Sequence, residues 1–146
     1  EVMAWAADYA NWSSLPLKMV DSDLISKNDT AFKFYLDRYK YPNRYPNSNT
    51  LEHREAAADI LREIEVALKD NWLGGSQPNF TDIAILPFIR QFRGVDAQWF
   101  DNLKDIPKII SWTNRFLDWE GFKNVMTKYP QWKPGDSVTT FGVNSL

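Results

Sequence analysis

Apolar residues recur at helical spacing along most of the chain, and no segment shows the apolar–polar alternation typical of a β-strand. The most regular stripe follows Asn49, which stands three residues before Glu52 in the arrangement of an approximate capping box. The stripe consists of Ala57, Ile60, Leu61, Ile64 and Leu68. Charged residues lie on the other side, so the segment is predicted to be an amphipathic helix that stops at Gly74-Gly75.

The same periodicity predicts three further helices, with residues 1–12 also compatible with a helix. They are a helix from about 29 to 40 with Phe32, Tyr35, Leu36 and Tyr39, one opening at Pro107 with Ile109, Trp112 and Phe116, and a short last one with Phe122, Val125, Met126 and Tyr129. Breaks in the pattern indicate a connecting segment at 13–28, a loop at YPNRYPNSN and an extended tail from Pro130. The expected fold is an all-α bundle.

The stretch PNFTDIAILPFIRQF, residues 78–92, has apolar residues pointing in every direction. A helix that is apolar all round is expected at the centre of a bundle. Asn79 is a good N-cap, and the carboxylate of Asp82 can accept a hydrogen bond from the Asn79 N–H, which completes a capping box. Pro87 removes one N–H from the helix interior and predicts a kink.

Asp82 has an alternative interpretation as a general acid or base, but that role needs a partner group. Its sequence neighbours are Thr81 and apolar side chains, so the structural interpretation is favoured. His53, the only histidine, lies on the apolar side of its helix and is interpreted as an edge-of-core residue. With one His and no Cys, no metal site is expected.

Composition narrows the function classes further. The length of 146 residues suits one domain, and the absence of cysteine excludes disulfides and thiolate catalysis by this chain. The net charge of −2 provides no field to attract nucleic acid or anionic lipid, although basic and aromatic residues alternate in YKYPNRYPN. No apolar run approaches the ~18 residues of a membrane span. Because the chain begins with Glu1 rather than Met, we expect it to be a piece of a longer protein.

The segment LGGSQPNFTDIAILPFIRQF resembles the central-helix signature of the C-terminal domain of glutathione S-transferases. In that family the helix opens with Ser or Thr, two residues and then Asp, and here Asn79 takes the first position. FYLDRYKYPNRYP, FRGVDAQWFD and NVMTKYPQWKPGD are similar to a bacterial branch of these enzymes. The resemblance implies that 1–12 is a remnant helix of a thioredoxin-like domain, that 13–21 is a linker, and that 22–146 is the all-α second domain, a bundle around a buried, N-capped central helix.

The resemblance also implies a function for the intact parent, a cytoplasmic, homodimeric detoxification enzyme. That enzyme conjugates glutathione to hydrophobic electrophiles or performs glutathione-dependent reduction. The thioredoxin-like domain holds glutathione and supplies the catalytic residue, so no catalytic, cofactor-binding or metal-binding residue is expected in this chain. The helical domain contributes part of the dimer surface and a wall of the electrophile pocket. The wall candidates are Tyr35, Arg38, Tyr39 and Trp132. The alternative is a non-catalytic protein–protein interaction module of the same fold.

Overall fold

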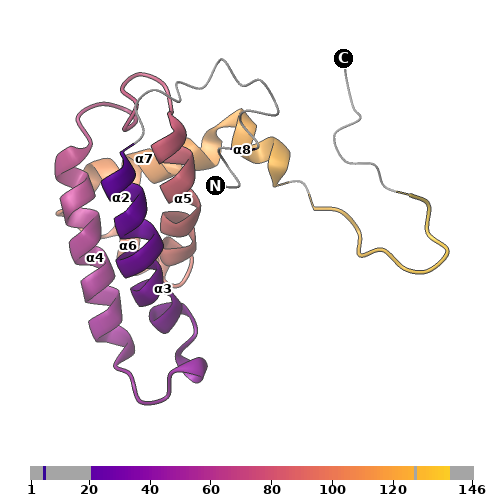
Figure 1. The fold of residues 1–146 in the computed structure, drawn as a ribbon, viewed down its shortest axis with the longest axis horizontal. Coiled ribbons are helices and arrows are strands. Elements are labelled where there is room, and N and C mark those ends of the chain that lie inside the picture. Colours follow the sequence, from indigo (N-terminus) through magenta and orange to yellow (C-terminus); the bar gives the residue numbers. More distant parts are fainter. Residues whose placement is uncertain (1–4, 6–20, 127, 139–146) are drawn as a thin grey trace.

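The computed structural model describes residue 5 and residues 21–126 and 128–138, and within them it contains helices and no named strand. The α-helices among the described residues are α2 (Ser22–Lys27), α3 (Lys33–Lys40), α4 (Thr50–Ala67), α5 (Phe80–Arg93), α6 (Ala97–Asp101), α7 (Pro107–Asp118) and α8 (Glu120–Val125) (Figure 1). The prediction of an all-α fold is confirmed. Of the proposed remnant 1–12 and linker 13–21, all but Trp5 and Asp21 lie outside the described residues.

The first described helix begins at Ser22, so the prediction of a connecting segment over 13–28 is wrong for its last part. Asp21 caps α2 by accepting from the N–H groups of Asp23 and Leu24. A π-helical turn, Asn28–Phe32, then joins α2 to α3. The wider turn shifts the phase of the apolar residues between the two helices, which hides α2 from a search for one regular period.

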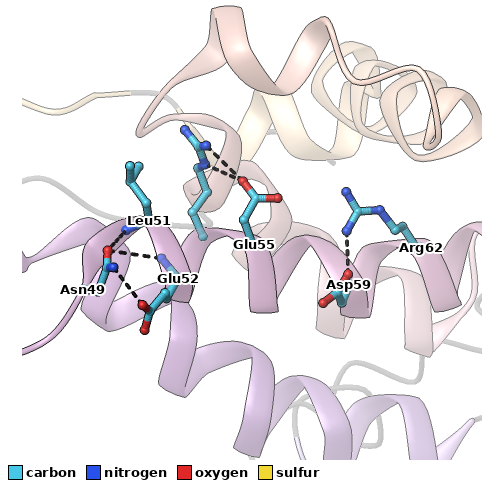
Figure 2. Close-up of polar contacts among 7 residues, drawn as sticks. Asn49, Leu51, Glu52, Glu55, Asp59 and Arg62 are labelled. Atoms are coloured by element: carbon cyan, nitrogen blue, oxygen red, sulfur yellow. Dashed lines mark hydrogen bonds and ion pairs between the residues drawn. The ribbon is translucent and has the colours of Figure 1, made fainter.

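The helix α4 begins after Asn49 as predicted, but its cap differs from a capping box. The Asn49 Oδ1 atom accepts from the N–H groups of Leu51 and Glu52 (Figure 2). The Glu52 carboxylate binds the Asn49 side-chain amide at 2.8 Å and not the backbone N–H. The helix ends at Ala67, before the predicted Gly74-Gly75, because Leu68 adopts an extended conformation and is buried.

The helix α5 runs through the core with Ile85, Leu86, Ile89 and Phe92 buried. It contacts α2, α3, α6 and α7, which confirms the prediction that this helix is central. The helix continues through Pro87, and the kink there stays a prediction. Within the described residues, no helix is both long and apolar enough to cross a bilayer.

The helix α7 begins at Pro107 and buries Ile109, Trp112 and Phe116, as predicted. The predicted packing of the last helix is only partly correct. Phe122 lies with its ring 4.4 Å from that of Phe116, but Val125, Met126 and Tyr129 are exposed. The sequence also gave no indication of the short helix α6.

Two residues join the ends of α4 and α7 by capping each other's helices. The Glu65 carboxylate accepts from the N–H groups of Lys108 and Ile109 in the first turn of α7. In return the Lys108 ammonium donates to the carbonyl oxygens of Glu65 and Leu68 at the end of α4. The negative charge of Glu65 thus lies at the amino end of α7 and the positive charge of Lys108 at the carboxyl end of α4, as the two helix dipoles favour. These contacts fix the start of α7, and with it Trp112, relative to the loop after α4.

A bidentate ion pair joins α5 to α6, and it predicts that the stability of the fold depends on pH. Arg93 donates to both carboxylate oxygens of Asp101, at 2.8 and 2.7 Å, and this lowers the pKa of Asp101 below its ordinary 3.8. A carboxyl whose pKa is lower in the folded state stabilises the fold at pH values above its unfolded-state pKa. That stabilisation is lost as the pH falls through the folded-state pKa.

We therefore expect Asp101→Asn to lower the free energy of unfolding at neutral pH by about 0.5–1 kcal/mol, because the pair is partly exposed. The difference from the unmodified chain should shrink as the pH falls below about 4. Urea unfolding at a series of pH values measures it. Asp118→Asn, at a more exposed and longer pair with Lys123, is the matched control. A difference that grows in acid would contradict the expectation.

Candidate functional site

Two of the four proposed wall residues, Tyr35 and Arg38, lie together on α3, beside the start of α4. The Tyr35 ring lies 5.9 Å from the His53 ring and 5.3 Å from the Phe34 ring. The Arg38 guanidinium lies 3.4 Å from the Phe34 ring centroid and 4.4 Å from that of Tyr45. Arg38 also donates to the Phe34 carbonyl. These residues form an aromatic surface. Its cation, the Arg38 guanidinium, contacts two rings and a carbonyl oxygen. His53 is half-buried there, in agreement with its interpretation as an edge-of-core residue.

Tyr39 occupies a different environment from Tyr35 and Arg38. It is buried, and its ring centroid lies 5.3 Å from that of Phe92 in the core. Burial raises the pKa of the Tyr39 hydroxyl, against the opposing effect of the nearby Arg54. Little of Tyr39 remains open to contact a ligand.

Trp132 is separate from the other three residues. It lies in the tail, which runs away from the helices beyond α8 (Figure 1). The tail turns at Lys133–Asp136, where the Asp136 N–H donates to the Lys133 carbonyl and Gly135 has φ 98°. With 61% of its surface exposed, Trp132 packs little against the rest of the chain, and its place in the pocket wall stays a prediction.

The start of α5 has both hydrogen bonds of the expected capping box. The Asp82 N–H donates to Asn79 Oδ1 at 3.1 Å, and the Asn79 N–H donates to Asp82 Oδ2 at 2.8 Å. The Asp82 carboxylate is fully buried and accepts three more hydrogen bonds, from the N–H groups of Leu73 and Gly74 and from Trp112 Nε1. Desolvation raises the pKa of Asp82, and these hydrogen bonds act in the opposite direction.

This arrangement gives Asp82 a structural role. Every group that it contacts through a hydrogen bond is an N–H donor, and none of these donors is an acid or base that could pass a proton to it. The bond between Asp82 and Asn79 is local and was predictable from the sequence. The loop and α7 donors were not predictable, because no spacing rule relates Trp112 to a residue thirty positions earlier.

Two of the hollows on the described residues bear on function, and neither contains a catalytic set. One, of about 450 Å³, lies beside the start of α5 and is lined by Asp21, Ser22, Leu24, Ala67, Leu73, Asn79 and Thr81. The other, of about 420 Å³, follows the outer face of α4, where Glu55 pairs with Arg54 and Asp59 with Arg62 (Figure 2). In the part of the chain that the structure describes, no three His, Cys, Asp or Glu side chains gather to hold a metal ion.

These features define an all-α domain built on a buried, N-capped central helix. The family model of the glutathione S-transferase C-terminal domain matches residues 31–133, and the chain belongs to that family. The match covers α3 to α8 and includes the Asn79–Asp82 cap. Searches of curated proteins and of solved structures found no match.

Proposed function

We propose that this chain is the C-terminal domain of a glutathione transferase whose thioredoxin-like domain precedes it. The family match supports the proposal, since glutathione is the co-substrate that membership implies. In the proposed parent, 1–12 is the last helix of the first domain, 13–21 is the linker and 22–146 is the second domain. We further propose that the parent is a bacterial, cytoplasmic homodimer that detoxifies hydrophobic electrophiles by conjugation or glutathione-dependent reduction.

Neither the start of α5 nor the Arg38 cluster fits a carboxylate of glutathione. Its two carboxylates need free backbone N–H groups or cations. At the start of α5 the buried carboxylate of Asp82 already occupies the position that an anion would take, and it would repel a second anion. Arg38 is held against two rings and a carbonyl. We therefore assign glutathione and the catalytic residue to the thioredoxin-like domain. This chain supplies a wall of the electrophile pocket, for which Tyr35 and Arg38 are the best-placed candidates, with Tyr39 behind them and Trp132 contributed by the tail.

The proposal predicts that glutathione binding requires both domains. Calorimetry should show no saturable binding of millimolar glutathione to residues 1–146 alone. The two-domain parent should bind it and transfer it to an aromatic electrophile. Saturable binding to the isolated chain would overturn the division of roles. A folded parent that neither binds glutathione nor transfers it would support a non-catalytic interaction module instead.

A further inference from the structure

The turn between α3 and α4 gathers unpaired positive charge in an acidic chain. It contains the stretch YKYPNRYPN and lies at the end of the bundle away from α8 and the tail (Figure 1). Neither Lys40 nor Arg44 forms an ion pair with any described residue. Carboxylates are not scarce, because the chain has 19 acidic and 17 basic residues, and other arginines do pair with them: Arg54, Arg62 and Arg93.

These two cations approach the same aromatic ring. The Lys40 ammonium lies 4.9 Å from the centroid of the Tyr41 ring, and the Arg44 guanidinium carbon lies 4.4 Å from it. The ring attracts each cation, but the two like charges repel each other. Lys40 donates only to the neutral amide of Gln91, at 2.7 Å, and the exposed side chain of Arg44, unlike that of Arg38, donates to no described residue. An anion beside the Tyr41 ring relieves this repulsion and accepts from the free donors of Arg44.

Backbone hydrogen bonds hold the turn in one arrangement. The N–H groups of Arg44 and Tyr45 donate to the carbonyl oxygens of Tyr41 and Pro42, at 2.9 and 3.0 Å. Ser48 donates to the Tyr45 carbonyl through both its N–H and its hydroxyl. A surface that is ordered before binding loses less entropy when a partner binds, and Tyr and Arg are the residues that often dominate the energy of protein interfaces.

The chemistry of the turn favours a carboxylate over nucleic acid. Nucleic acid binds to such surfaces by stacking its bases on open rings within a field of net positive charge. Here cations already lie over the rings of Tyr41 and Tyr45, and the chain has a net charge of −2. A carboxylate instead accepts hydrogen bonds in the plane of a guanidinium, and the contact of Arg44 with a ring leaves those donors free.

From these observations we propose that the α3–α4 turn, consisting of Lys40, Tyr41, Arg44 and Tyr45, is a docking surface for an acidic segment of a partner protein. Carboxylates of that segment bind the Arg44 guanidinium and the Lys40 ammonium, and the stems of its side chains pack against the two tyrosine rings. The proposal is independent of glutathione chemistry, since none of these four residues is a candidate for the wall of the electrophile pocket.

The test is the binding of a fluorescent hexaglutamate peptide to the full chain, measured by anisotropy at low salt. Binding should be saturable and should weaken as salt is added, whereas uncharged hexaglutamine should not bind. Arg44→Gln and Lys40→Gln should each weaken the binding by about two- to five-fold. Lys104→Gln, which removes the same charge from an exposed lysine after α6, is the matched control and should leave the binding unchanged. Equal thermal midpoints of the three variants show that each is folded.

Amide chemical shifts in nuclear magnetic resonance spectra locate the contact, which should lie at residues 40–45. Hexathymidylate, an anion of similar length, provides a second probe. Tighter binding of hexathymidylate at these residues would assign the surface to nucleic acid and would overturn the proposal. An equal loss of hexaglutamate binding in Lys104→Gln would show that the attraction is diffuse, with the same consequence. The proposal also fails if millimolar hexaglutamate shows no saturable binding.

Discussion

Replacing Asp82 with Ala should lower the free energy of unfolding by about 3–5 kcal/mol, because several buried N–H groups lose their acceptor at about 1–3 kcal/mol each. The carboxylate accepts hydrogen bonds from Leu73, Gly74, Asn79 and Trp112, which belong to the loop after α4, the cap of α5 and the middle of α7. Alanine leaves all four donors without an acceptor. The loss therefore exceeds the ~1 kcal/mol typical of an N-cap substitution.

Urea unfolding followed by circular dichroism measures this loss. Asn79→Ser is the matched control, because serine retains an oxygen that can accept from the Asp82 N–H and should be nearly neutral. Hydrogen exchange gives a local measurement on the same proteins, since the amides of Leu73 and Gly74 should lose protection in Asp82→Ala and retain it in Asn79→Ser. An unchanged unfolding midpoint in Asp82→Ala would contradict the role of this carboxylate in joining the three segments.

Replacing Trp112 with Phe should lower the free energy of unfolding by about 2–4 kcal/mol, through a cavity in the core and the lost hydrogen bond. The indole is fully buried, and its Nε1 donates to Asp82 at 2.8 Å. Trp132→Phe is the matched control, since that side chain is exposed and the substitution should have no measurable effect.

The two large effects should not add. Asp82→Ala and Trp112→Phe both remove the bond between Asp82 and Trp112, so the double variant should lose less stability than the sum of the two single losses. Chemical unfolding of the four proteins of this cycle measures the coupling. Strict additivity would show that the bond contributes nothing to stability.

Elements with local determinants were predictable from the sequence. The cap of α5 joins residues three positions apart, and the start of α7 follows from a proline at a position where a helix tolerates it. The stripe of α4 predicted its buried face, because five apolar residues lie on one side over a long helix. In each case the information lies within a few turns of one helix.

Other boundaries and contacts were decided by tertiary structure. The helix α4 stops at Ala67 and not at the glycines. The loop after it is held by two sets of contacts: the Asp82 carboxylate accepts from the N–H groups of Leu73 and Gly74, and Lys108 of α7 donates to the Leu68 carbonyl. The helix α2 was missed because a π-helical turn shifts its phase relative to α3. Tyr35 and Trp132 are apart because the path of the tail depends on contacts that helical spacing does not encode.

The sequence by itself determined the all-α class, the central helix and its local cap, because helical periodicity and capping depend on neighbours in the chain. Tertiary structure alone decided that Asp82 also joins the loop to α7 and that the Nε atom of Arg90 is buried without an acceptor among the described residues. The physical reason is the range of the interactions. Capping acts over three residues, whereas the burial of a charge and the pairing of its hydrogen bonds depend on which distant segments pack around it.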